Sequence, residues 1–248
     1  MSRSLRKWTC YQCHGPFIGS LLIRGFWQLR LSLLSLVGQI PVDIKDLNVD
    51  LLSFTAHKLY GPKGIGALFI RNGVTINRFM EGGAQERNRR AGTENIAGAV
   101  GFASAIKKAV ANLEENSAKL TKMRDRLIKT VLTTIPYTRL NGDAEKRLPG
   151  NANFSIEYIE GESILLMLDL NKISASSGSA CTSGSLDPSH VLLALGLSHE
   201  VAHGSLRISL GHNNTEEDID YILEVLPKIT KTLRNMSPLW EKVEKRES

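Results

Sequence analysis

Strand-like and helix-like segments alternate along most of the chain, and this alternation limits the fold more than any other feature. Residues 49–55 and 67–71 are short apolar runs typical of buried strands, and a glycine-rich turn at 61–66 separates them. Residues 93–113 and 116–134 then show the composition and spacing of two helices. Strands that alternate with helices are typical of α/β and α+β proteins, so we expect this fold class.

The second half of the chain continues the same mixture. Residues 153–158 and 206–210 are predicted strands, and residues 162–170 are a predicted helix between them. Thr215 is placed to cap a last long helix, because an acidic first turn follows it. That helix carries apolar residues at the spacing of a core-facing stripe: Ile219, Ile222, Leu223, Leu226, Ile229 and Leu233.

Composition excludes several classes of protein. The 248 residues are 42% hydrophobic and 23% charged, which excludes a disordered or low-complexity chain. The net charge of +6 is too evenly spread to favour nucleic-acid binding, so we expect no nucleic acid as a direct partner. The apolar stretch at 17–37 is interrupted too often for a membrane span, so we expect no membrane partner either. Only three cysteines are present, which favours a reducing, cytoplasmic location.

The N-terminal stretch differs from the rest, because no acidic residue precedes Asp43. It contains Cys10-Tyr-Gln-Cys13-His14, the C-x-x-C-H pattern that can attach a c-type haem or supply half of a zinc site. A second Cys or His pair at zinc-binding spacing does not follow in the sequence. Since such a short pattern often arises by chance, we interpret it as a coincidence, with haem binding as the alternative.

Lys58 is the first candidate for catalysis. It follows the predicted strand 49–55 and precedes the glycine-rich turn, where a lysine can be desolvated and held rigidly. Those conditions favour formation of an imine. Thr55 and His57 flank the lysine with donors suited to a phosphate, and the alternative is a solvated loop lysine.

Cys181 is the second candidate. It lies among small polar residues at 174–185, and nothing in that segment would bury it. We therefore expect an exposed, mobile loop whose thiol is a nucleophile that must swing to its target. The alternative is a free cysteine buried as a small hydrophobic residue.

Arg207 and the segment 81–93 complete the candidates. An arginine inside the predicted strand 206–210 is costly unless it is paired, and its planar fork suits a carboxylate. The alternative is a structural ion pair with an aspartate or glutamate. The segment 81–93 brings glycines and Thr93 to a predicted helix start, so it is either a phosphate cradle or a basic solvated loop.

Taken together and in this order, these motifs resemble the cysteine desulfurases of the NifS/IscS type, within the class V aminotransferases. The motifs are His57-Lys58-Leu-Tyr-Gly-Pro-Lys-Gly, Arg-Arg-Ala-Gly-Thr93, Ser-Ser-Gly-Ser-Ala-Cys181-Thr-Ser and the Arg207 strand. The resemblance runs from about residue 37 to about residue 240. It implies an enzyme of fold type I that uses pyridoxal 5'-phosphate (PLP) and works as a homodimer.

The resemblance also implies a role for each candidate. Lys58 would bind PLP through an imine and move the Cα proton of L-cysteine, whose carboxylate Arg207 would bind. Cys181 would take the sulfur as a persulfide, leaving L-alanine, and would serve as a transient ligand of a nascent iron–sulfur cluster. The sulfur acceptor would be an iron–sulfur scaffold protein or a tRNA-thiolating enzyme. The implied cofactor contacts are those of Thr55, Ala56, His57 and Lys58, with Thr93 reaching across the dimer interface.

Two departures from the family accompany this resemblance. The family's Asp and Gln that bind the PLP ring correspond in position to Ser32 and Ser35, and a serine cannot stabilise a pyridinium charge as a carboxylate does. Family members are also much longer at the N-terminus. We therefore expect a truncated member: residues 1–36 as a leader outside the family, 37–112 as a remnant of the large PLP-binding domain, and 113–248 as an α+β small domain.

Such a chain is expected to bind PLP weakly and to have little activity of its own. Two other functions stay open. One is a non-catalytic fragment that relays sulfur or binds a partner. The other is a different class V lyase, such as a selenocysteine lyase or a kynureninase.

Overall fold

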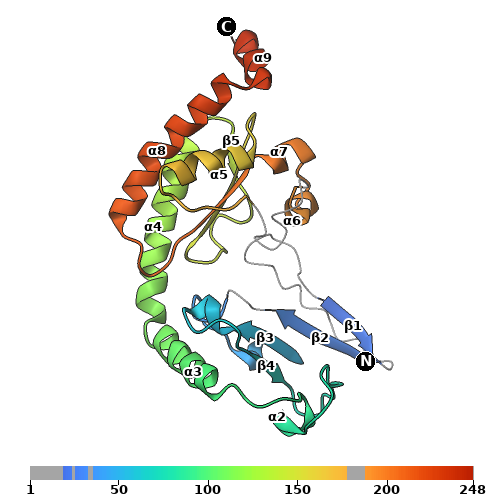
Figure 1. Cartoon of the computed structure of the whole chain (residues 1–248). Helices are drawn as coiled ribbons and strands as arrows, with labels where there is room; N and C mark the ends of the chain where they lie inside the picture. Colours follow the sequence, from blue (N-terminus) through green and yellow to red (C-terminus); the bar gives the residue numbers. More distant parts are fainter. Residues whose placement is uncertain (1–18, 24–25, 33–35, 178–187, 248) are drawn as a thin grey trace. The chain divides into compact units, whose positions relative to one another are not determined.

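The computed structural model describes residues 19–23, 26–32, 36–177 and 188–247. The chain divides into two compact units, which we call the N-terminal unit (Phe17–Glu115) and the C-terminal unit (Asn116–Ser248). Each unit mixes helices and strands, and each is described by itself (Figure 1).

The N-terminal unit is built on a four-stranded sheet in the order β1-β2-β3-β4. Its strands are β1 (Gly19–Ile23), β2 (Phe26–Ser32), β3 (Leu51–Thr55) and β4 (Gly66–Ile70), and its helical elements are α1 (Ile44–Leu47), η1 (Ala56–Leu59), α2 (Gln85–Asn88) and α3 (Ile96–Ala111). β2 runs parallel to β3, whereas β4 runs antiparallel to β3. Both strands expected in this region are confirmed, and β2, which lies within residues 1–36, joins their sheet.

Helix α3 begins later than the sequence predicts. The expected start was residue 93, but the helix begins at Ile96 with Asn95 as its cap. The Asn95 side chain accepts a hydrogen bond from the backbone N–H of Gly98 at 2.9 Å, which satisfies a donor that the first turn leaves free. Thr93 therefore precedes the helix and does not cap it.

Helix α4 (Leu113–Thr134) follows α3 in the chain. Among the described residues, no single helix combines the length and the hydropathy needed to cross a membrane, although α3 and α4 taken as one bent pair meet those two criteria. Six residues of α4 are buried inside the protein, among them Leu120, Met123 and Leu127.

The C-terminal unit has a three-stranded antiparallel sheet in the order β5-β6-β7. Its strands are β5 (Thr138–Leu140), β6 (Asn151–Ile156) and β7 (Ser205–Ser209), and its further helices are α5 (Gly161–Leu170), α6 (His190–Ala194), α7 (His199–His203), α8 (Glu216–Asn235) and α9 (Pro238–Glu247). The strands expected at 153–158 and 206–210 and the helix expected at 162–170 are confirmed, with shifts of one or two residues at most ends.

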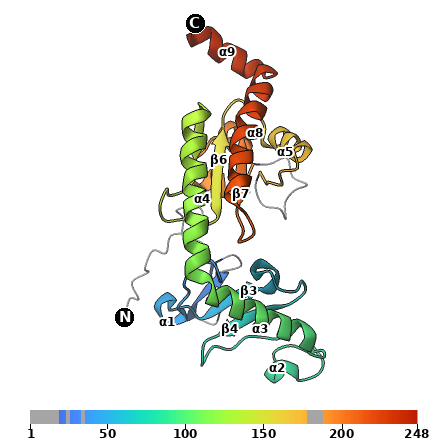
Figure 2. The same ribbon diagram turned by 90° about the vertical axis from the view of Figure 1, so that its left-hand side faces the viewer.

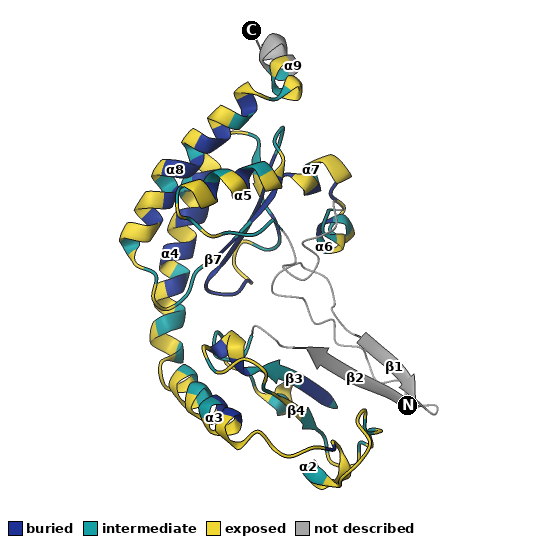
Figure 3. Ribbon diagram, viewed as in Figure 1, coloured by how far each residue is buried: buried dark blue, intermediate teal, exposed yellow. Residues whose placement is uncertain are grey.

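Helices α4 and α8 lie side by side against this sheet (Figure 2). Arg126 of α4 links them through ion pairs with Glu216, at 2.9 Å, and with Asp220. The apolar stripe predicted on α8 faces inward: Ile219, Ile222, Leu226 and Ile229 are buried in one core together with β6 and β7. Figure 3 shows this core as buried segments along the sheet and on the facing sides of α4 and α8.

Thr215 caps α8, as the sequence predicts. Its side chain accepts from the backbone N–H of Asp218, and the Asp218 carboxylate accepts from the backbone N–H of Thr215. This reciprocal capping box fixes the start of the helix.

Candidate functional site

The end of β3 brings three of the predicted site residues onto one short turn. The strand ends at Thr55 and continues directly into the 3₁₀ turn η1. The Oγ1 atom of Thr55 lies 2.9 Å from Nδ1 of His57 and donates to the carbonyl oxygen of Ile65 at 3.3 Å. The hydroxyl, the imidazole and the Lys58 amine therefore follow one another within four residues.

The period of this turn decides which side chains reach solvent. A 3₁₀ helix has three residues per turn, so Ala56 and Leu59 share one face. Both are buried, in a cluster with Phe102 of α3. Burial of that face leaves His57 and Lys58 exposed. The expected desolvation of Lys58 is thus wrong for the described N-terminal unit, because the turn directs the amine away from its core.

Ala56 has a structural role in the turn, apart from its predicted contact with a cofactor. Its side chain is fully buried, and its backbone N–H donates to the carbonyl oxygen of Ile65 at 3.1 Å. The following Gly61 lies tight against it, since a Cβ there would meet the carbonyl oxygen of Ala56 at 3.0 Å. A contact between Ala56 and a cofactor stays a prediction.

The segment 81–93, for which a phosphate cradle and a basic solvated loop were both considered, contains an unusual turn. Glu86, Arg87 and Asn88 have φ angles of 50°, 58° and 65°, three left-handed residues in a row. The Gln85 side chain accepts from the backbone N–H of Gly92 at 3.2 Å and closes this turn. Thr93 is exposed beyond it, and its phosphate contact across a dimer interface stays a prediction.

Arg207 lies in β7, opposite Asn153 of β6. Its Nε atom is buried and has no hydrogen-bond partner among the residues that the structure describes. Within those same residues no aspartate or glutamate forms an ion pair with it, so the structural ion pair considered as an alternative is not seen there. A buried guanidinium N–H without a partner is costly, and a carboxylate ligand would satisfy it.

The backbone beside Arg207 holds the start of the cysteine segment. Ser176 and Arg207 exchange two backbone hydrogen bonds, of 3.1 Å and 2.6 Å. Ser205 also donates its hydroxyl to the carbonyl oxygen of Ser177. Gly161 lies under this junction, and a Cβ there would meet the carbonyl oxygen of Ser205 at 2.7 Å. Sequence reasoning missed this junction, because the paired residues lie about thirty positions apart.

Several predicted residues fall outside the described ranges. Cys181 is one, and its exposure and role stay predictions, as does its part in holding an iron–sulfur cluster. Cys10, Cys13 and His14 are others. Among the described residues, no group of three or more His, Cys, Asp or Glu side chains could hold a metal ion.

The described residues fit one end of PLP. Thr55 and His57 offer phosphate donors, and the exposed Lys58, the next residue along the turn, offers an amine. The described residues do not fit the pyridine ring of PLP equally well. Ser32, which stands where the family has its aspartate, pairs with Ser53 in the β2–β3 register, and its position supplies no carboxylate for the ring nitrogen. We conclude that the phosphate and imine ends fit, whereas the ring lacks its acid at that position.

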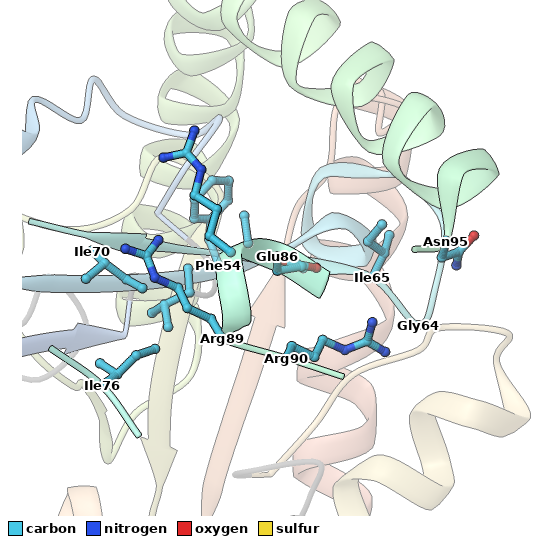
Figure 4. Close-up of a pocket in the computed structure, with 13 residues that line it drawn as sticks. Phe54, Gly64, Ile65, Ile70, Ile76, Glu86, Arg89, Arg90 and Asn95 are labelled. Carbon is cyan, nitrogen blue, oxygen red and sulfur yellow. The ribbon is translucent and has the colours of Figure 1, made fainter. Parts of the chain in front are cut away.

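A separate cavity of about 700 Å³ lies in the N-terminal unit (Figure 4). One wall is β4, with Gly66, Leu68 and Ile70, and another holds Arg89 and Arg90. Thr55, His57 and Lys58 are not among the residues that line it. The cavity is therefore distinct from the turn that carries the amine.

Comparison with known proteins adds independent observations. The family model described as Aminotransferase class-V matches residues 34–222. A Clostridium botulinum (strain Hall) protein named cysteine desulfurase IscS is 60% identical over 207 residues, covering 83% of this chain and 52% of the relative. One from Methanosarcina thermophila with the same name is 57% identical, covering 83% and 51%.

Two solved structures have the same fold. A NifS-like protein superposes with a TM-score of 0.74 at 35% identity, covering 82% of this chain and 52% of the other. A NifS-like protein from Rickettsia africae gives 0.73 at 32% identity, covering 82% and 53%. The predicted fold class, part of fold type I, is confirmed. The chain spans about half the length of the curated relatives it matches.

Proposed function

Because the chain belongs to the class-V aminotransferase family, we propose that it serves the PLP-dependent removal of sulfur from L-cysteine, which yields L-alanine and a persulfide on Cys181. Relatives about 60% identical carry the name cysteine desulfurase, which supports this reaction. The observation that carries the proposal is the buried Nε of Arg207, which has no partner among the described residues and lies beside the start of the cysteine segment. It leaves a group suited to a carboxylate where the segment that contains Cys181 begins.

Arg207 orients the substrate in this proposal. Its fork binds the carboxylate of L-cysteine, and the carboxylate completes the hydrogen bonding that Nε lacks. Strand β7 is well suited to hold this group, because Leu206 and Ile208 on either side are buried in the core. The carboxylate is thereby fixed before the sulfur is attacked.

The turn after β3 supplies the proton chemistry. PLP, when bound, withdraws electrons from the substrate and so weakens its Cα–H and Cβ–S bonds. Thr55 and His57 hold the cofactor's phosphate, and Lys58 takes the Cα proton once its amine is free. The exposure of Lys58 leaves its amine accessible for both roles.

Cys181 accepts the sulfur. Its thiolate attacks the substrate's sulfur, a sulfur–sulfur bond forms, and the Cβ–S bond breaks with its electron pair moving to the carbon side. The sulfur stays on Cys181 as a persulfide, and the remaining carbon skeleton leaves as L-alanine after protonation. The Ser176–Arg207 hydrogen bonds and the Ser205–Ser177 hydrogen bond support this assignment, since they start the loop on the strand that binds the carboxylate.

The same proposal includes the protein's partners. The chain acts as a homodimer in the cytoplasm, and Thr93 contacts the cofactor phosphate bound to the other copy. The persulfide passes to an iron–sulfur scaffold protein or to a tRNA-thiolating enzyme. In the first case Cys181 is also a transient ligand of the growing cluster.

The test uses the full chain with PLP and L-cysteine, and measures alanine together with the mass of the Cys181 peptide. We expect slow turnover, well below that of the Clostridium botulinum relative assayed alongside, because Ser32 stands where a ring-binding acid is expected. Cys181→Ser should abolish the persulfide, and Lys58→Ala should abolish alanine. Alanine at the level of a PLP-only control would overturn catalysis by this chain alone.

A matched pair of variants isolates the carboxylate site. Arg207→Lys should raise the KM for L-cysteine about 10-fold or more, because lysine cannot replace a two-pronged contact. Arg139→Lys makes the same change at an exposed position on β5 and should leave KM unchanged. If no alanine forms but a relative loads sulfur onto Cys181, the chain is a sulfur relay.

A further inference from the structure

The sheet of the C-terminal unit has a second face, opposite its large apolar core. Phe154 and Ile156 of β6 belong to that core. Because successive side chains of a strand point to opposite faces, Asn153 and Ser155 lie on the second face. Arg207 lies there too, since it is paired directly with Asn153 across β6 and β7. This face of the sheet is therefore polar around Arg207.

Two buried side-chain atoms have no hydrogen-bond partner within the described residues, and both belong to this polar face. They are Oδ1 of Asn141 and Nε of Arg207. Asn141 directly follows β5, and its backbone N–H donates to the carbonyl oxygen of Asn153 at 2.8 Å. Asn153 in turn is paired with Arg207. The two atoms thus belong to the ends of one row across the sheet, the Asn141–Asn153–Arg207 row.

The backbone hydrogen bonds show that Asn153 and Arg207 form a close pair. The N–H of Ile156 donates to the carbonyl oxygen of Gly204 at 2.8 Å. In an antiparallel ladder such hydrogen-bonded pairs alternate with non-hydrogen-bonded pairs, whose side chains lie closer together. Counted from Ile156, the Asn153–Arg207 pair is of the second kind, and the backbone of Arg207 pairs instead with Ser176. The side chains of Asn153 and Arg207 are therefore close neighbours.

Asn141 fixes the orientation of the Asn153 amide. Its Nδ2 donates to Oδ1 of Asn153 at 2.8 Å and to Oγ of Ser155 at 2.9 Å. Both N–H groups of Asn141 are thereby used, while its own Oδ1 is left buried without a partner in the described part of the chain. Because Oδ1 of Asn153 faces Asn141, the NH₂ group of Asn153 is turned away from Asn141.

Asn153 and Arg207 are consequently two neighbouring donors with the same unmet need. Within the described ranges, neither Nδ2 of Asn153 nor the guanidinium of Arg207 has a hydrogen-bond or ion-pair partner. Both residues are half-buried, so a small ligand can reach them. A carboxylate offers two oxygens that each accept more than one hydrogen bond, and it can therefore satisfy both residues together.

We propose that Asn153 is a second residue that recognises the substrate carboxylate, and that Asn141 is a positioning residue for it. The Asn153 amide donates to the carboxylate beside Arg207, and Asn141 holds that amide with its NH₂ group outward. Arg207 supplies the charge, whereas the second donor fixes the rotation of the planar carboxylate. This inference rests on the proposed reaction of L-cysteine, and it makes the site selective for an amino acid over the corresponding amide.

The first experiment follows the side-chain N–H signals of Arg207 and Asn153 by NMR in the isotope-labelled full chain. The ligands are L-alanine, which is the proposed product, and L-alaninamide, which lacks the carboxylate, each added with and without PLP. L-Alanine should shift both signals and bind about 10-fold tighter or more than L-alaninamide, because a carboxylate is the stronger acceptor for Arg207. If L-alanine leaves the Asn153 signal unchanged both with and without PLP, the proposal is overturned.

Variants of Asn153 test its role as a donor. Asn153→Ala should weaken binding of L-alanine about 10-fold and leave that of L-alaninamide nearly unchanged. Asn153→Asp keeps the size of the side chain but places a negative charge beside the ligand's carboxylate, so L-alanine should bind more weakly still. Asn235→Asp makes the same change at the exposed end of α8 and should bind both ligands normally. Normal binding of L-alanine by Asn153→Asp would refute the donor role.

Asn141→Asp tests the positioning role. An ionised aspartate has no N–H, so the Asn153 amide must turn its NH₂ group toward it and present its oxygen to the ligand. L-Alanine should then bind about 10-fold more weakly, as it does to Asn153→Ala. Because Asn141 is only 1% exposed, circular dichroism checks that the variant folds, and the half-buried Asn153→Ala decides the proposal if it does not. A folded Asn141→Asp that binds L-alanine normally would exclude the positioning role.

These measurements are independent of the desulfuration assay. If the chain forms no alanine from L-cysteine, the proposed function fails, while the titrations still decide whether Asn153 recognises a carboxylate. If it does form alanine, Asn153→Ala should raise the KM for L-cysteine about 10-fold and change kcat little, because the carboxylate is bound in the ground state and the transition state alike. A lower kcat with an unchanged KM would contradict recognition of the carboxylate by Asn153.

Discussion

The two units bury their apolar residues very differently. In the C-terminal unit seventeen buried residues form one continuous cluster that joins α4, α5, α8 and the sheet. In the described part of the N-terminal unit, the buried apolar residues form clusters of only two and three. Fully or largely exposed apolar side chains remain there, among them Phe79, Ile96 and Val100. The comparison teaches that the C-terminal unit has one large core, whereas the described part of the N-terminal unit has only small ones; exposed apolar side chains, such as Leu170 and Met236, occur in the C-terminal unit as well.

This contrast extends to the site residues. Arg207 lies on a strand whose neighbours are fully packed, so its backbone position is fixed by the C-terminal core. Lys58 lies on an exposed turn of the unit with the smaller clusters. The backbone at Arg207 is therefore held by the core of its own unit, whereas the Lys58 side chain is exposed on its turn.

The strongest test of the contrast compares one core truncation in each unit. Phe154→Ala removes a ring with 0% exposure from the large cluster and should cost about 3–5 kcal/mol of unfolding free energy. Leu52→Ala should cost about 2–3 kcal/mol, because its partly buried neighbours can close around the gap. Hydrogen exchange of the β6 and β3 peptides during a urea titration separates the two units. Equal losses of unfolding free energy in the two variants would contradict the difference between the large C-terminal core and the small N-terminal clusters.

The next prediction concerns Arg234, a buried cation at the edge of the C-terminal core. Arg234 is 4% exposed; it donates to the carbonyl oxygen of Pro136 at 2.7 Å, and its guanidinium lies 4.6 Å from the ring centre of Trp240. Burial lowers the pKa of Arg234, yet an arginine keeps its charge throughout the usual pH range. Arg234→Met should cost about 2–3 kcal/mol, since it leaves buried carbonyl groups unpaired.

The control for this variant is Arg139→Met at an exposed position on β5, which should change stability by less than about 0.5 kcal/mol. Urea unfolding followed by circular dichroism measures the unfolding free energy of both variants. If Arg139→Met lowers the unfolding free energy as much as Arg234→Met does, burial is not the reason why Arg234 stabilises the protein.

The start of α8 offers a smaller, pH-dependent test. Thr215→Ala removes the cap and should cost about 1 kcal/mol. Hydrogen bonds from Asn214 and from the backbone of Thr215 hold the pKa of Asp218 below its ordinary value of 3.8. Because the folded pKa is depressed, the stabilisation is fully present above pH 4 or so and is lost as the pH falls through the folded value.

Asp218→Asn should therefore flatten the loss of stability below about pH 4, while leaving the shape of the curve at neutral pH unchanged. Thermal unfolding measured from pH 7 to pH 2 checks this. An unaltered acid limb in Asp218→Asn would rule out the capping carboxylate as a source of the pH dependence.

The smallest effect on stability is expected at Phe79, which is 99% exposed. Phe79→Ser should change the unfolding free energy by less than about 0.5 kcal/mol. It should nevertheless weaken self-association in sedimentation experiments, because it removes an apolar side chain from the surface. A clear loss of stability would show that the N-terminal unit buries this ring after all, and would narrow the contrast between the units.

The parts of the fold that were predicted are those with a strong local pattern. β3, β4, β6 and β7 are apolar runs between turn residues, and the stripe on α8 has the helical period. β5, with three residues, was missed because so short a strand has no period to recognise. The start of α3 was predicted two to three residues early, at Thr93; in the structure the hydrogen bond from the Gly98 N–H to the Asn95 side chain fixes the start at Ile96.

The sequence by itself determined the order of its motifs, the fold class and the family, because these follow from residue types at fixed spacing along the chain. Only the tertiary structure decided that the turn period exposes Lys58, that Nε of Arg207 is buried without a described partner, and that Ser176 pairs with Arg207. The reason is that burial and hydrogen bonding are settled between residues far apart in the chain. Arg207 meets Ser176, and Ala56 meets Phe102, only after folding.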